Sequence, residues 1–193
     1  MNIIPEPLTT RLAKKKIKNL MEESKFLLEY GSGGSTLYAS KFCERIMSVE
    51  TDYKFYKFLQ KMKLNNTQLL FVNVGKTNLY GVGKKHETFL FENNLCEEYS
   101  SSPWKLMKQK NPDLVFIDGR YRVASLLYSL INNENEKCQY IFDDYKNRPF
   151  YHIIDKYINL IDVCENTIFF EKKQNIDFKE IQYLIKIYNN DFR

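Results

Sequence analysis

A glycine-rich turn follows the first strand-like run of the sequence, and an acidic residue stands directly before it. The segment 29–36 reads EYGSGGST, so Glu29 is followed by a tyrosine, three glycines and three small hydroxyl side chains. Glycine lets the backbone approach a ligand closely, because no side chain intervenes. A carboxylate beside such a turn disfavours a phosphate group. It favours an ammonium group, which Glu29 or the neighbouring carbonyls can receive.

A second acidic residue, Glu50, ends the next strand-like run, about 20 residues after the turn, where an acid can take both hydroxyls of a ribose. The turn lacks the lysine of a P-loop, and Thr36 stands where a dinucleotide fingerprint has its third glycine. An amine, a ribose and no phosphate together point to S-adenosylmethionine as the ligand. The alternative is that Glu29 and Glu50 are ordinary surface carboxylates at strand ends.

Polar side chains also follow two later strand-like runs. They are Asp118, Arg120, Asp143 and Asp144. In open α/β sheets, ligands bind outside the carboxyl ends of the strands. We therefore expect these side chains to gather at the same edge of a sheet as Glu50.

Such a site requires strands whose carboxyl ends meet, and the sequence alternates strand-like and helix-like segments. The strand-like segments are short and apolar: 25–29, 45–49, 68–74, 113–117 and 138–142. The helix-like segments between them are 35–43, 52–62 and 121–131. This alternation predicts parallel strands that are joined by right-handed crossovers.

The remaining segments predict three further helices and a hairpin. The helices run from Thr9 or Thr10 to about Glu23, from Pro149 onward, and over 176–190. Proline is suited to the first turn of a helix, because its missing N–H would have no partner there. Two apolar runs, 161–164 and 167–170, flank a tight connection, which is typical of an antiparallel hairpin.

The segment 75–103 shows little periodicity, and we expect a long loop that partly covers the strand ends as a lid. The sequence as a whole predicts one domain over residues 1–193, with an N-terminal helix within 1–23. The predicted fold class is α/β. It is a Rossmann-like three-layer sandwich with a mostly parallel sheet and a C-terminal antiparallel hairpin.

Several of these segments resemble a known family. LLEYGSGGST resembles motif I of class I S-adenosylmethionine-dependent methyltransferases, and SVETD resembles their motif II. DGRYRVA and DDYKNRPFY are similar to segments of one branch of small Rossmann-like methyltransferases. The resemblance covers about residues 20–172 and implies methyl transfer from S-adenosylmethionine. It implies that residues of both motifs, together with Asp118, contact the cofactor. We add Tyr30 and Ser32 of the same turn. The expected cofactor-binding residues are Glu29, Tyr30, Gly31, Ser32, Gly33, Ser35, Glu50 and Asp118.

A second similarity concerns sugar and catechol-type O-methyltransferases, which place an aspartate after the fourth strand and an acidic pair after the fifth to hold Mg²⁺. Asp118, Asp143 and Asp144 match those places. A hard cation takes carboxylate oxygens, binds a substrate hydroxyl and lowers the pKa of that hydroxyl. Arginines close to these aspartates leave another interpretation open, an Asp–Arg network that shapes the pocket without metal.

Four residues are candidates for a direct part in the reaction: Asp118, Arg120, Asp144 and His152. His152 is a candidate general base because the pKa of imidazole lies near neutral pH; the alternative is a packed or surface histidine. The expected reaction transfers a methyl group to an oxygen or nitrogen of a small molecule or glycan. The protein aligns the acceptor with the methyl group and removes the acceptor's proton.

Composition indicates a globular protein and leaves the partner open. Lys and Arg number 29 against 24 Asp and Glu, a net charge of +5, and 44% of the residues are hydrophobic, which excludes global disorder. The positive charge and the lysines within 14–18 leave open a nucleic-acid-binding module or nucleic-acid methyltransferase. A further alternative is a cofactor-binding scaffold without catalysis. No apolar run approaches the roughly 20 residues that span a bilayer, and widely spaced cysteines predict reduced thiols in a cytoplasmic compartment.

Overall fold

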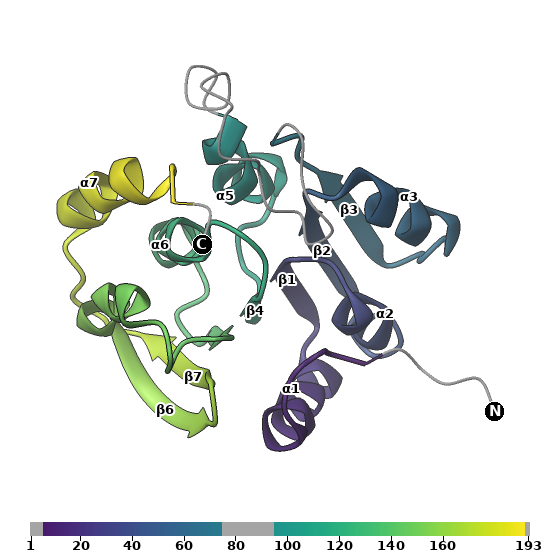
Figure 1. Ribbon diagram of the computed structural model, residues 1–193, viewed down its shortest axis with the longest axis horizontal. Coiled ribbons are helices and arrows are strands. Elements are labelled where there is room, and N and C mark those ends of the chain that lie inside the picture. Colours follow the sequence, from purple (N-terminus) through teal and green to yellow (C-terminus); the bar gives the residue numbers. More distant parts are fainter. Residues whose placement is uncertain (1–5, 75–94, 192–193) are drawn as a thin grey trace.

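The computed structural model describes residues 6–74 and 95–191, and its centre is a seven-stranded sheet (Figure 1). In spatial order the strands run β3-β2-β1-β4-β5-β7-β6. Their bounds are β1 Phe26–Tyr30, β2 Arg45–Glu50, β3 Thr67–Phe71, β4 Leu114–Ile117, β5 Gln139–Phe142, β6 Ile158–Cys164 and β7 Thr167–Lys172. Strands β1 to β5 are parallel, and β7 pairs antiparallel with both β5 and β6.

Helices cover both faces of this sheet (Figure 1). One face packs against α1 Arg11–Glu23 and α2 Gly34–Ala39, and the other against α5 Leu95–Leu106, α6 Arg122–Asn132 and α7 Phe178–Tyr188. The helix α3, Tyr53–Lys61, contacts β2 and β3, and the 3-10 helix η1, Pro149–Tyr157, precedes β6. Within the described ranges, no helix is both long and apolar enough to cross a membrane.

The strand β1 shows how one short segment serves two cores. All five of its residues are buried. Leu27 packs with the core under α1 and α2, whereas Leu28 packs with the core under α5 and α6. Successive side chains of a strand point to opposite faces, so a continuous apolar run fits a strand that is covered on both sides.

The predicted fold class is confirmed: the sheet is mostly parallel, helices cover both faces, and the C-terminal hairpin is antiparallel. The predicted helix after Pro149 is partly wrong. It is a 3-10 helix that ends at Tyr157, and β6 begins at Ile158 instead of residue 161. The strand begins this early because Ile158 already pairs with Lys172 of β7.

The predicted loop 75–103 also needs correction. Its last part is helical, because α5 begins at Leu95 and includes Pro103, and the part 75–94 lies outside the described residues. Tyr99 and Trp104 of this helix have buried side chains. Burial of two large aromatic side chains outweighs the single backbone hydrogen bond that a proline removes.

Candidate functional site

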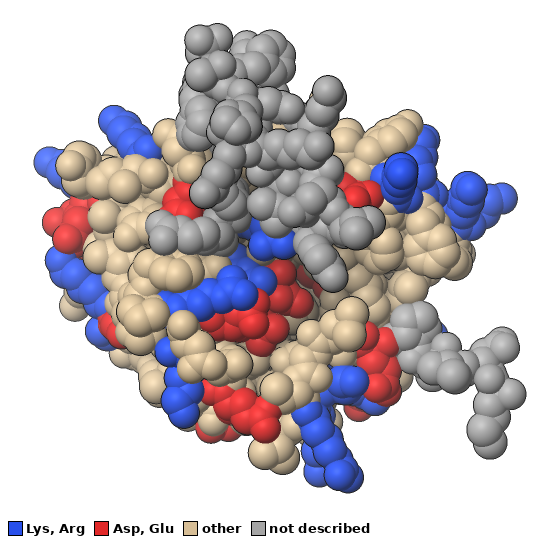
Figure 2. All heavy atoms as spheres, viewed as in Figure 1, with Lys and Arg blue, Asp and Glu red and all other residues tan. Residues whose placement is uncertain are grey.

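A hollow of about 550 Å³ lies where β1, β2 and β4 end. Its walls come from three segments that are distant in sequence: the turn 31–35 after β1, residues 50–52 at the end of β2, and residues 118–120 after β4. Phe55 and Phe58 of α3 form an aromatic side. Figure 2 shows acidic side chains flanked by basic ones near the middle of the face in view. A hollow of this volume fits a small-molecule cofactor.

The glycine turn is held by direct backbone contact with the neighbouring strand ends. Gly31 has a φ of +97°, and a Cβ atom there would lie 2.6 Å from the Cα atom of Gly119. Gly119 is equally confined, because its own Cβ would lie 2.0 Å from the hydroxyl of Tyr99. The amides of Gly31 and Ser32 donate to the Val49 carbonyl at 3.0 and 3.3 Å. The position of the turn is therefore fixed by β2 and β4.

Glu29 lies beneath this turn and does not line the hollow. It is fully buried, and its carboxylate accepts hydrogen bonds from the hydroxyls of Ser35, Thr36 and Ser48. Burial raises the pKa of Glu29, and the three hydroxyls oppose that rise. This geometry differs from the expected ammonium contact, because the Glu29 carboxylate holds the turn from beneath and does not face the hollow.

Glu50 is the buried carboxylate that faces the hollow. Its Oε1 atom accepts hydrogen bonds from the backbone amides of Thr51 at 2.6 Å and Asp52 at 2.8 Å. Burial raises the pKa of Glu50 to about 7, and the two amides oppose that rise. The amides fix the orientation of the carboxylate, and no described residue forms a hydrogen bond with Oε2. Glu50 therefore has an acceptor oxygen for the hydroxyls of a ligand.

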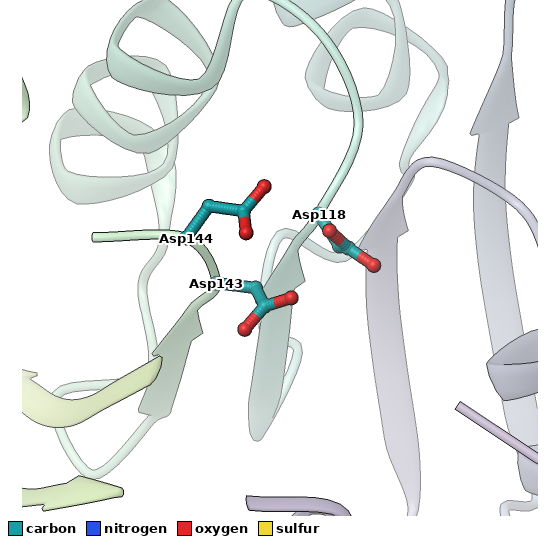
Figure 3. Close-up of side chains that lie close together, drawn as sticks. All are labelled: Asp118, Asp143 and Asp144. Atoms are coloured by element: carbon teal, nitrogen blue, oxygen red, sulfur yellow. The ribbon is translucent and has the colours of Figure 1, made fainter. Parts of the chain in front are cut away.

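Three aspartates gather at the adjoining ends of β4 and β5. Asp143 and Asp144 leave β5 and extend toward Asp118 after β4 (Figure 3), and one oxygen of each lies within 4.8 Å of the others. Asp118 also lines the hollow. Burial raises the pKa of Asp118 to about 7, although Arg122 opposes that rise. The structure thus brings the three predicted metal ligands together.

Arginine and threonine side chains already engage these carboxylates. The Arg122 guanidinium lies 3.2 Å from Asp118 and 3.1 Å from Asp144, and Arg148 lies 2.8 Å from Asp144. The carboxylate of Asp143 accepts a hydrogen bond from the Thr167 hydroxyl. The residues present therefore fit the Asp–Arg network better than a Mg²⁺ site.

Two predicted site residues lie elsewhere. The hydroxyl of Tyr30 is buried in the core, where it donates to the Ser100 carbonyl at 2.7 Å and accepts from the Trp104 indole at 2.9 Å. His152 lies on the exposed side of η1 with its ring 4.7 Å from that of Tyr145. It lines a second hollow, which shares no lining residue with the one that Asp118 and Arg120 line. His152 is therefore not placed to act as a base beside the glycine turn.

The sequence interpretation missed Phe55 and Phe58. The helical spacing of 52–62 predicted one apolar side of a helix, with no part in the site. Instead Phe55 and Phe58 stack at 5.9 Å beside the hollow, and Phe58 stays 45% exposed. Arg122 belongs to the Asp–Arg network that the sequence left open: it is buried, and it donates to the backbone carbonyl of Asp143, directly after β5.

Solved structures resemble the chain over nearly its whole length. A methyltransferase-like protein from Silicibacter pomeroyi matches with a TM-score of 0.81 and 23% sequence identity, covering 96% of this chain and 97% of that chain. The chain has a Rossmann-like methyltransferase fold. The N-methyltransferase NodS from Bradyrhizobium japonicum matches with a TM-score of 0.50 and 9% identity, covering 85% of this chain and 96% of that chain. A tRNA m1G37 methyltransferase from M. jannaschii has a TM-score of 0.47 and 10% identity, covering 91% of this chain and 51% of that chain.

No family model matches the sequence, and no curated protein matches it at a significant level. The likeness to solved structures therefore concerns the fold. Function must be inferred from the chemistry of the hollow, because one fold hosts many activities.

Proposed function

We propose that the protein is an S-adenosylmethionine-dependent methyltransferase that acts on an oxygen or nitrogen of a small molecule or glycan. The observation that carries this proposal is the place of Glu50. Its carboxylate opens into the hollow that also contains the glycine turn 31–35 and Asp118. A diol-binding acid, a closely approachable backbone and a second acid suit a ligand with a ribose and an amine.

Each part of the hollow matches one part of that cofactor. Glu50 binds the ribose hydroxyls through Oε2, and the aromatic rings of Phe55 and Phe58 cover the adenine. The carbonyls of the turn 31–35 receive the ammonium group of the amino-acid tail. Two acidic side chains near the turn make the hollow unfavourable for a phosphate group, which distinguishes this ligand from a dinucleotide.

When bound, the cofactor supplies a methyl group on a positively charged sulfur. The residues of this chain have to align an acceptor and take its proton. We assign the proton to Asp118, because its carboxylate lines the hollow and its pKa is raised to about 7, near the pH at which a general base is effective. Arg120, which lines the same hollow, orients the acceptor, and Asp144 supports Asp118 through their shared contact with Arg122.

Calorimetry with S-adenosylhomocysteine tests the cofactor assignment. Glu50→Gln is expected to weaken binding about ten- to hundredfold, because a hydrogen bond to a charged group contributes about 1.5–3 kcal/mol. Glu44→Gln is the matched control, since Glu44 is exposed and does not line the hollow. Unchanged affinity in a folded Glu50→Gln protein would contradict the ribose assignment. Binding without turnover on any acceptor would favour a scaffold that has no catalysis.

A nucleic-acid acceptor is the second candidate, and one surface favours it. Between Tyr53 and Val74 the sequence has four lysines and no acidic residue: Lys54, Lys57, Lys61 and Lys63. None of these lysines forms an ion pair with a described residue. Tyr53 and Phe58 are 55% and 45% exposed on the same helix. Basic side chains among exposed rings are typical of surfaces that bind single-stranded nucleic acid.

The lysines at the N-terminus, in contrast, are mostly engaged. Lys14 and Lys18 pair with Glu6, and Lys16 pairs with Asp162. The two acceptor classes can be separated by fluorescence anisotropy with a labelled RNA oligonucleotide. Salt-sensitive binding that Lys57→Glu and Lys61→Glu abolish would favour a nucleic-acid acceptor, and absence of binding at low salt would favour the small molecule or glycan.

A further inference from the structure

A buried arginine joins the ends of β4 and β5. Arg122 is the first residue of α6, and its side chain is 5% exposed. Its Nε donates to the Gly119 carbonyl at 2.9 Å, and its NH1 nitrogen donates to the Asp143 carbonyl at 2.6 Å. Its NH2 nitrogen lies 3.2 Å from an Asp118 carboxylate oxygen and 3.1 Å from an Asp144 carboxylate oxygen. One guanidinium thus contacts both strand ends and the carboxylates of two of the three clustered aspartates.

These contacts are mutually dependent. A buried guanidinium is costly unless its donors are paired, and clustered carboxylates repel one another unless a cation lies between them. The backbone is bent to make the arrangement possible: Tyr121 and Asp144 have φ values of +50° and +58°. Such left-handed conformations in residues other than glycine persist where the surrounding contacts hold them.

We propose that the Arg122 guanidinium is the resident cation of the Asp118–Asp143–Asp144 cluster and holds Asp118 and Asp144 in place without a divalent metal ion. Arg122 is accordingly a positioning residue, which acts through Asp118. The inference deepens the proposed function, because Asp118 is the proposed proton acceptor there. Cation binding is measured in the absence of the cofactor, so the two can fail separately.

The contact distances support a guanidinium over a metal ion. Mg²⁺ requires oxygen ligands at about 2.0–2.1 Å in octahedral geometry. Here nitrogen-to-oxygen distances of 3.1 and 3.2 Å are those of ion pairs, and the backbone carbonyls of Asp118, Gly119 and Asp143 accept from the same planar group. A metal ion at this place would have to displace the guanidinium and leave a buried positive charge beside it.

Binding of Mn²⁺, followed by the loss of the free Mn²⁺ signal in electron paramagnetic resonance, tests the proposal. The wild-type protein is expected to bind no Mn²⁺ at micromolar concentrations. Arg122→Met, which keeps an unbranched side chain and removes the guanidinium charge, is expected to bind about one Mn²⁺ per chain. A second substitution, Asp144→Asn, should abolish this binding. Arg148→Met is the matched control, because Arg148 contacts Asp144 from the outside and Arg122 remains in place.

Wild-type protein that binds Mn²⁺ and loses it on Asp144→Asn substitution would overturn the proposal. So would a folded Arg122→Met protein that binds none. Arg122→Lys covers the case in which methionine prevents folding, since it keeps one positive charge in the cluster. It is expected to stay free of Mn²⁺, and Mn²⁺ binding by this variant would also overturn the proposal.

Discussion

The two buried glutamates of the site, Glu29 and Glu50, differ in which groups their carboxylates meet. Glu29 is surrounded by three hydroxyls of its own chain, whereas Glu50 has two backbone amides on one oxygen and the hollow beside it. The sequence predicted a polar site from both residues, because both end strand-like runs. It could not distinguish their roles, since one partner of Glu29 is Ser48, on the neighbouring strand.

Glu50 makes folding stability depend on pH. Its pKa is about 7 in the folded protein against 4.5 for an ordinary glutamate, so the folded state binds the proton more tightly. The contribution to the free energy of unfolding is fully present below pH 4.5 and is lost as pH rises through 7. The loss is at most about 3 kcal/mol. Glutamine does not ionise, so Glu50→Gln lacks this loss. The free energy of unfolding of the variant, relative to that of wild type, should therefore be higher at pH 8 than at pH 5.

Urea denaturation of both proteins at the two pH values measures this gain. Glu44→Gln, at an exposed position, is the control and should show the same difference from wild type at both pH values. An equal difference for Glu50→Gln at pH 5 and pH 8 would mean that Glu50 is ionised in the folded protein at both values.

At the scale of elements, the contact between Gly31 and Gly119 makes the ends of β1 and β4 one structural unit. A Cβ atom on Gly31 would lie 2.6 Å from the Gly119 backbone, and its φ of +97° is strained for any other residue. Gly33 belongs to the same turn, but a Cβ atom there meets only Ser35, at 3.6 Å. The two glycines therefore form a matched pair for substitution.

Gly31→Ala is expected to lower the free energy of unfolding by about 2–4 kcal/mol, through a steric clash and an unfavourable φ. Gly33→Ala is expected to change it by less than about 1 kcal/mol, because its backbone conformation is open to alanine. Chemical denaturation with circular dichroism measures both values. Equal effects of the two substitutions would contradict the close backbone contact.

The accuracy of the sequence interpretation varied with how local the signal was. Strands such as β1 were predicted because a run of apolar residues fits a strand that is buried on both faces. The helix α5 was missed because Pro103 lies inside it and its stability comes from burial of Tyr99 and Trp104, which is tertiary. His152 was predicted beside the site because it follows β5, a strand that the sequence predicted correctly. The short 3-10 helix η1 instead directs its ring toward Tyr145.

At the scale of the molecule, the hollow joins segments from the first third and the middle of the chain. Occupation by a ligand should therefore stabilise the whole fold, by about 2.7 kcal/mol at a concentration of one hundred times Kd. For a chain of 193 residues this corresponds to a rise in Tm of about 5–10 °C. S-adenosylhomocysteine should produce this shift, and Glu50→Gln should reduce it.

ATP is the comparison ligand for this thermal measurement. It shares the adenine and ribose of S-adenosylhomocysteine and carries phosphates in place of the amino-acid tail. The acidic side chains of Glu50 and Asp118 should repel those phosphates, so ATP is expected to leave Tm nearly unchanged. A larger rise with ATP than with S-adenosylhomocysteine would indicate that the glycine turn binds a phosphate.

The main chains of Gly31 and Gly119 touch, and this has a consequence for related sequences. Neither loop has room for an inserted residue, because lengthening one would push the other strand end out of the sheet. Variation in loop length among proteins of this architecture should therefore be concentrated in their other connections.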